Sequence, residues 1–216
     1  MADEVYSIEN IIEDLNYNYM SIEDYYKALD SKLLIAKDYL EDDISFQRDN
    51  PLHPLSMDNR FRRIDAADAL LKKAQNKDFN QNLLDIVHKH LFDCCSAVRL
   101  SLVRALLYVG NETSVKPLEA LINVEKESNA VKNITNIVLD KIVNNKSFIE
   151  ADLYLYVGDI KDNNADGIGK MYYKHNGQIV YEGEFKNNKF HGEGIYYNDD
   201  GSIRYKGTFE DGRFIG

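Results

Sequence analysis

Hydrophobic side chains in this chain follow two different periods, and the change between them falls near residue 150. Upstream, apolar residues recur every three to four positions, which is the period of one face of an α-helix. Downstream, aromatic and polar residues alternate in short runs broken by Gly, Asn and Asp, which is typical of β-hairpins. We therefore expect a segregated α+β fold, with helices first and an antiparallel sheet after them.

Two amphipathic helices are predicted within the first 45 residues. One apolar stripe begins at Ile8 and ends at Tyr19, and a second begins at Ile22 and ends at Leu40. Ser21, with Asp24 three residues on, is a capping signal for the second helix. We expect both helices to cover the end of the helical region as an N-terminal cap. The stretch 46–56, which holds two prolines, is expected to be irregular.

Residues 93–122 predict two short helices. Gly110 ends the first, Ser114 stands where it would cap the second, and Pro117 falls within the first turn of the second. The order Asp93, Val98-Arg99, Ala105-Leu106, Gly110 and then spaced leucines resembles a HEAT repeat of the bacterial type.

Fainter copies of this pattern flank it. Arg63 precedes Ala69-Leu70-Leu71 as Arg99 precedes Ala105-Leu106-Leu107, a period of 36, and Lys132 marks a degenerate copy at a period of 33. The resemblance extends over about residues 58–145. It implies an N-terminal α-solenoid whose helix pairs bury a continuous core.

The C-terminal part repeats one phrase. Tyr156, Tyr181 and Tyr205 each open a Tyr-x-Gly unit at spacings of 25 and 24, and a glycine follows each tyrosine after 11 residues. Such a period indicates a repeat architecture of stacked hairpins, each with a polar turn and a returning Gly-x-Gly strand. Glycines inside the strands would let neighbouring hairpins or aromatic rings approach closely. The structural repeat positions are Tyr156, Gly158, Gly167, Gly169, Tyr181, Gly183, Gly192, Gly194, Tyr205 and Gly207.

These residues, over about 156–216, resemble the MORN repeat family, although the units are longer than usual and Ile160 stands where an aromatic is expected. The resemblance implies an elongated β-meander that contacts proteins and, in some members, membrane lipids, without catalysis. A phosphate-binding loop at Gly167-x-Gly169 would need a following Gly-Lys-Ser/Thr and a helix, and neither follows. The expected domains are an N-terminal helical cap at 1–45, a HEAT-like α-solenoid at 46–147 and a MORN-repeat β-sheet at 148–216.

Charge is unevenly distributed. Residues 1–50 hold 13 acidic and 4 basic side chains, so most of the net charge of −10 lies there. Acidic helix faces are often only solvated surface. They also suit a basic partner protein, whose association they would speed and orient. The candidate partner-binding residues are Glu13, Asp14, Glu23, Asp24, Asp30, Arg62 and Arg63.

Candidate catalytic and metal-binding chemistry is sparse. His88 and His90 lie two apart on a predicted helix and point to different faces, so they do not form a metal pair. The only cysteines, Cys94 and Cys95, are too few for a disulfide framework or a zinc site. We expect no enzyme activity, no cofactor and no metal. The absence of a signal peptide or long apolar run predicts a cytoplasmic setting, and the Asn, Lys and Ile content suggests an AT-rich bacterial genome.

Three function classes follow. The first is a protein-protein interaction module, in its most concrete form a bacterial immunity or inhibitor protein that binds a basic partner. The second is a scaffold or membrane-adjacent organiser built on the MORN repeats, which the acidic charge disfavours. The third is a DNA-binding HEAT protein, for which Arg60, Arg62, Arg63, Arg99 and Arg104 would have to share one face. An acidic chain makes nucleic acid an unexpected partner and membrane a poor one.

Overall fold

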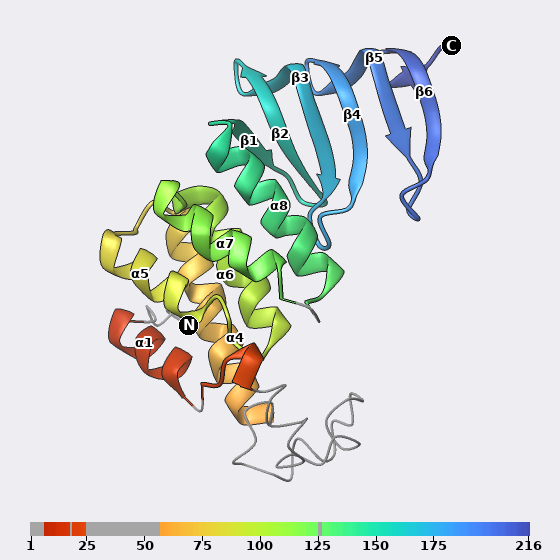
Figure 1. The fold of residues 1–216 in the computed structure, drawn as a ribbon. Helices are drawn as coiled ribbons and strands as arrows, with labels where there is room; N and C mark the ends of the chain where they lie inside the picture. The colour runs from red at the N-terminus through yellow and green to blue at the C-terminus, as the bar shows by residue number, and fades with distance from the viewer. Residues whose placement is uncertain (1–6, 18, 25–56, 125–126) are drawn as a thin grey trace. The chain divides into compact units, whose positions relative to one another are not determined.

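The computed structural model describes residues 7–17, 19–24, 57–124 and 127–216. Helices occupy the first part and a seven-stranded antiparallel sheet the last, so the predicted segregated α+β class is confirmed (Figure 1). The chain divides into two compact units, residues 1–125 and residues 126–216. The solenoid arrangement of the helices and their HEAT resemblance remain predictions, since only the presence of helices supports them.

The helices of the first unit begin and end largely where the sequence predicts. Ser7 caps the first of them through a bond from the Asn10 amide, Asn80 caps α5 in the same way, and Gly110 ends α6. The elements are α1 (Ile8–Asn16), α4 (Met57–Gln75), α5 (Gln81–His90), α6 (Ser96–Val109), the 3₁₀ turn η2 (Glu112–Ser114) and α7 (Val115–Ile122).

The core of this unit lies where α4 packs against α6 and α1 packs against α4. Ile11 and Leu15 on α1, Leu70 on α4 and Leu102 and Leu106 on α6 are all fully buried. The first predicted stripe is therefore a packing face. Most of the second stripe, together with Asp30 and the stretch 46–56, lies outside the described residues.

The start of α7 differs from the prediction. Ser114 makes no capping bond to this helix. Its hydroxyl instead accepts from the Asn111 amide at 3.4 Å and lies 2.8 Å from Nε2 of His88. The Asn111 carboxamide accepts from the Thr113 amide, so a capping box one turn earlier starts the 3₁₀ turn that leads into α7. The prediction that Ser114 caps the helix was wrong because its hydroxyl bonds back to Asn111.

The second unit holds one helix and the sheet. Its strands pair in chain order, each antiparallel to the next, which is the predicted meander. Helix α8 groups with the sheet, whereas the sequence placed it with the preceding helices and set a boundary at residue 147. The elements are α8 (Asn129–Val143), β1 (Ser147–Glu150), β2 (Tyr154–Lys161), β3 (Asn164–Tyr173), β4 (Ile179–Lys186), β5 (Lys189–Tyr197), β6 (Ile203–Glu210) and β7 (Arg213–Phe214).

Two-residue turns close the hairpins at one end of the sheet. Asn187 and Asn188 both have positive φ, 49° and 65°, as a type I′ turn requires. Asp162-Asn163 and Asp211-Gly212 repeat this geometry in the units before and after. The predicted polar turns are confirmed, and they recur along the sheet with the same period as the tyrosines in the sequence.

Helix α8 lies along the beginning of the sheet (Figure 1). The Asn133 carboxamide donates to the carbonyl oxygen of Asn176 at 3.2 Å, and Gly177 lies close to Ile134. Asp140 pairs with Lys146 at 2.8 Å just past the helix end. These contacts tie the helix to the β3–β4 connection and to the segment before β1.

The register of the strands places equivalent residues in rows across the sheet. Ser147 opposes Gly158, and the row continues through four more glycines to β6. A neighbouring row holds mainly tyrosines. The glycine row is Gly158, Gly169, Gly183, Gly194 and Gly207, and the tyrosine row is Tyr156, Met171, Tyr181, Tyr196 and Tyr205.

Candidate functional site

The acidic residues of α1 lie on the outside of the first unit. Glu13 is exposed, whereas Asp14 is partly covered and lies 3.7 Å from Nη1 of Arg62. The Arg62 guanidinium also stacks over the Tyr17 ring, 4.4 Å from its centroid. The structure thus brings Asp14 and Arg62 together, and both belong to the residues proposed to bind a partner.

The segment after α1 is also held by the helices. The Ile22 amide donates to Phe92 O at 2.7 Å, and the Cys94 amide donates to Met20 O at 2.8 Å. Ser21 accepts from the Asp24 amide at 3.1 Å, which confirms the predicted capping signal. Glu23 and Asp24 are exposed. These acids therefore stand on an anchored segment, while Asp30 lies outside the described residues.

Arg63 differs from the other candidate partner-binding residues because it is fully buried. Its Nε donates to Asp93 at 2.8 Å, and its Nη1 donates to Tyr17 O at 3.2 Å. Arg99, also buried, donates to the backbone oxygen of Asp93 at 2.5 Å. Buried charges need partners of this kind. The Arg63 guanidinium joins α4, the N-terminal segment and the α5–α6 connection, so its role is structural.

The two helical histidines have separate surroundings, as expected. The His88 ring contacts the Ser114 hydroxyl, whereas the His90 ring is buried with its centroid 4.8 Å from that of Tyr19, edge to face. Burial lowers the pKa of His90 to about 4, and nearby Lys89 and Arg63 act in the same direction. In the described parts of the chain, no group of His, Cys, Asp and Glu side chains is arranged to hold a metal ion.

In the sheet, the recurring spacing of tyrosine and glycine within the repeats has a direct packing cause. The ring of Tyr181 lies over Gly183 and Gly194, which face each other on adjacent strands. Its hydroxyl lies 3.1 Å from Glu184 O and 3.2 Å from His191 O, within donating distance of both. Burial raises the pKa of Tyr181 to about 12, so the hydroxyl keeps its proton.

The preceding repeat has the same arrangement. Tyr156 lies over Gly158 and Gly169, and its hydroxyl donates to Asp159 O at 2.8 Å. These glycines are therefore structural positions, where a side chain would collide with a buried ring.

The first glycine of each Gly-x-Gly has a different role. Gly167 and Gly192 have positive φ, 115° and 52°, a conformation that L side chains rarely adopt. Each lies against an acidic side chain of the neighbouring strand, and that carboxylate accepts the next backbone amide. Asp159 accepts from the Ile168 amide at 2.9 Å, and Glu184 accepts from the Glu193 amide at 3.2 Å.

The last repeat is more open. Tyr205 is 40% exposed, whereas Tyr156 and Tyr181 are buried, and its ring stacks on Phe214 at 4.9 Å. Gly207 lies close to the carbonyl group of Gly216.

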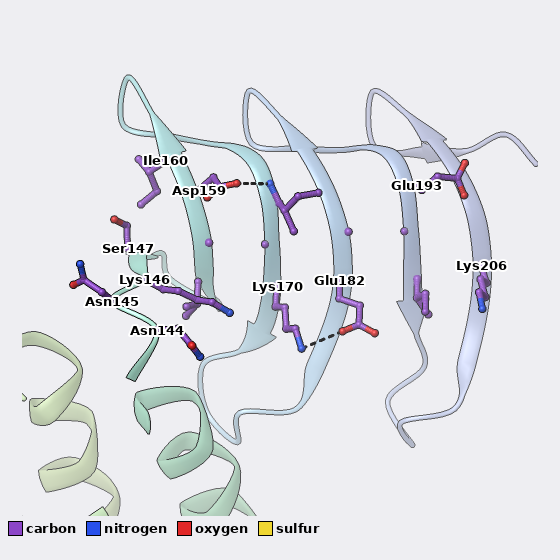
Figure 2. A pocket seen from close by; sticks show the side chains of 17 residues that line it. Asn144, Asn145, Lys146, Ser147, Asp159, Ile160, Lys170, Glu182, Glu193 and Lys206 are labelled. Carbon is purple, nitrogen blue, oxygen red and sulfur yellow. Dashed lines mark hydrogen bonds and ion pairs between the residues drawn. The ribbon is translucent and has the colours of Figure 1, made fainter. Parts of the chain in front are cut away.

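The face of the sheet opposite the tyrosine row carries an open hollow of about 860 Å³ (Figure 2). The segment Asn144–Ser147, which joins α8 to β1, borders it at one end. Across the strands it is lined by side chains of mixed charge, and Lys170 pairs there with Glu182 at 3.3 Å. Glycines of the glycine row also line the hollow, so backbone alone forms part of its surface.

The repeated glycines, the tyrosine rings over them and the single-layered meander fall in a segment that is similar to a known repeat. Residues 156–174 and 181–203 match the MORN repeat. A search of curated proteins found none that matches the chain. The match confirms the predicted resemblance in the C-terminal part, and no comparable match supports a HEAT repeat upstream.

MORN repeats are a non-catalytic module that generally contacts proteins or membrane lipids. Among the described helices, none is long and apolar enough to cross a membrane. No sequence motif indicates the hollow. Apart from the segment Asn144–Ser147, its lining residues are ordinary positions on strands β2 to β6, and only the cross-strand register brings these together.

Proposed function

We propose that this chain is a non-enzymatic protein-binding module whose acidic N-terminal segment meets a basic surface of a partner protein. The MORN match supports a binding role. The single observation that carries the choice of partner is the charge of residues 7–24, which include five acidic side chains and no lysine or arginine.

The geometry of this segment suits a docking surface. Glu13 and Glu23 are exposed, while Ile11, Leu15 and Ile22 hold the backbone against the helices. A charged surface fixed in this way speeds encounter with an oppositely charged protein. The attraction is screened over about 8 Å at physiological salt, so association should slow as salt rises.

In its most concrete form, the proposal is a bacterial immunity or inhibitor protein that occupies a basic toxic partner. The support is the acidic charge together with a repeat module suited to protein contacts. A toxin or secretion gene next to the gene for this chain would favour this form over a general scaffold.

A scaffold that works near membranes is the second candidate, and the MORN match favours it. The net charge of −10 opposes it, because anionic lipid repels an acidic surface. The DNA-binding alternative fails on geometry. Arg63 and Arg99 are buried around Asp93 and do not share an exposed face with the other arginines.

Charge reversal tests the proposal. The variant Glu13→Lys/Glu23→Lys is compared with Glu112→Lys/Glu119→Lys, which changes two exposed acids elsewhere in the same unit by the same net charge. Each protein is used for affinity capture from the native cell. Association rates with the captured partner are then measured by surface plasmon resonance at about 0.05 M and 0.5 M salt.

We expect the first variant to associate more slowly than the wild type at low salt, and the control to match the wild type. Equal rates for all three proteins would show that the acidic segment is only solvated surface. Partner binding that is lost equally in both variants would point to net charge and not to this segment.

A further inference from the structure

The hollow on the polar face of the MORN sheet has the form of a furrow that crosses the strands. Gly158, Gly169, Gly183 and Gly194 line it in one row, and none of them contributes a side chain. Their missing Cβ atoms point to the other face, where the tyrosine rings lie. The base of the furrow is therefore low along the glycine row and higher on either side.

One side of the furrow is a single cross-strand row. Val157 opposes Lys170, which opposes Glu182; the row continues to Ile195 and Lys206. The other side includes Ile168, which is 62% exposed and precedes Gly169 of the glycine row. It also includes Glu193 (Figure 2). Apolar and charged side chains thus both occur along a line perpendicular to the strands, with the charged pair Lys170 and Glu182 between Val157 and Ile195.

The charges of the furrow are not equally available. Glu182 accepts from the Tyr197 hydroxyl at 2.6 Å and pairs with Lys170, and Glu193 accepts from the Thr208 hydroxyl at 2.6 Å. Lys206 has no ion-pair partner within the described residues. A ligand that lies in the furrow would therefore meet an apolar surface at Ile195 and an unneutralised ammonium group one strand further on.

The length of the furrow suits a short extended chain. Neighbouring strands lie about 4.8 Å apart, so the four intervals from β2 to β6 span about 19 Å, or about six extended residues. Side chains on one face of an extended peptide are about 7 Å apart, about 2 Å more than the spacing of the strands that hold Ile195 and Lys206. The long side chain of Lys206 can span this difference, so one peptide side chain can reach Ile195 and the next Lys206.

We propose that this furrow binds an extended peptide segment of a partner protein across the strands, with a branched apolar side chain on Ile195 and a carboxylate side chain on Lys206. The charge complementarity at Lys206 selects an acidic position in the peptide. The furrow belongs to the second unit and the acidic N-terminal segment to the first. The furrow favours an acidic ligand and the segment a basic one, so the two would bind different parts of a partner.

Selection from a displayed library of random heptapeptides against the intact chain tests the proposal. We expect enrichment of sequences in which an acidic residue follows Val, Ile or Leu by two positions. Binding of the best labelled peptide is then measured by fluorescence anisotropy for the wild type, for Lys206→Glu and for Lys186→Glu. Lys186 is an exposed lysine of the same sheet that lies outside the furrow, and serves as the matched control.

We expect Lys206→Glu to weaken binding about fivefold, the upper range for one partly exposed ion pair, and Lys186→Glu to leave it unchanged. Replacing the acidic residue of the peptide by Lys should restore binding to Lys206→Glu. Failure to enrich any sequence, or equal binding by Lys206→Glu and the wild type, would overturn the proposal. The proposal would also be overturned if no peptide is enriched and the protein floats with vesicles containing phosphatidylserine in a way that depends on Lys206. That result would indicate that the furrow binds lipid.

Discussion

The phenol ring of Tyr181 fills the space that a Cβ atom on Gly194 would need: such an atom would lie 2.7 Å from Cε2 of the ring and closer still to its hydroxyl end. Gly194 stands on the strand next to that of Tyr181, and Tyr156 covers Gly169 in the same way one repeat earlier. The pairing of tyrosine with glycine explains why both residue types recur with one period.

Replacement of Gly194 by Val should therefore destabilise the second unit. We expect the free energy of unfolding to fall by about 1–3 kcal/mol, the usual cost of overpacking. Chemical denaturation of the variant and the wild type measures this difference. The control is a double-mutant cycle with Tyr181→Ala, in which the added side chain should cost less because the ring is absent. A cycle with no coupling would show that the ring does not cause the constraint.

The Tyr181 hydroxyl makes a second prediction possible. Tyr181→Phe removes the donor to Glu184 O and His191 O and should cost about 1 kcal/mol of unfolding free energy. Tyr196→Phe, a change in the same row of the sheet, should cost less. No hydrogen bond of the Tyr196 hydroxyl is found in the described structure. Similar losses in the two variants would mean that the hydroxyl bonds of Tyr181 contribute nothing special.

The buried ion pair of the first unit should be sensitive to loss of either partner. Asp93→Asn leaves the Arg63 guanidinium buried without a full counter-charge and should lower the unfolding free energy by about 3–5 kcal/mol. Asp14→Asn, which affects the half-exposed pair with Arg62, should cost about 1 kcal/mol or less. Thermal unfolding of both variants provides the comparison. A small effect at Asp93 would contradict the role assigned to Arg63.

His90 should make stability depend on pH. Its pKa is about 4 in the fold, below the ordinary 6.5, so between these values the unfolded chain binds a proton that the folded chain does not. Its contribution is complete above pH 6.5 and is lost as pH falls toward 4, by about 2–3 kcal/mol. The unfolding free energy, measured by chemical denaturation at several pH values in this range, should depend less on pH for His90→Phe than for the wild type. An equal dependence of unfolding free energy on pH in both proteins would show that His90 is not the group that titrates.

The sequence predicted the hairpins well because their determinants are local. Turn residues such as Asn187-Asn188 and the fixed tyrosine spacing act within one repeat, and the structure places the turns and strands there. The close approach of rings to strand glycines was also expected from the glycines themselves. The prediction that Ser21 is a cap was correct, and the prediction that Ser114 is a cap was wrong. A serine hydroxyl next to a helix can accept a hydrogen bond from more than one nearby backbone amide, and the sequence does not show which.

Contacts between distant segments were harder to foresee. Arg63 and Asp93 are 30 residues apart, and nothing in their immediate neighbours distinguishes Arg63 from the half-exposed Arg62. The grouping of α8 with the sheet depends on contacts such as that of Asn133 with Asn176, which no periodicity reveals. The furrow likewise needs the register of five strands, since its lysines and glutamates look like ordinary surface residues in the sequence.

The glycine row also limits which misaligned sheets the chain can form. A slip of one residue would bring a side chain under a tyrosine ring and exchange the two faces, so it is strongly disfavoured. A shift by one whole repeat keeps each glycine opposite a glycine, and the row by itself does not distinguish it from the native pairing. The contact from Asn133 to Asn176, which joins α8 to the β3–β4 connection, breaks this translational degeneracy. Helix α8 thus sets the origin from which the repeats are counted.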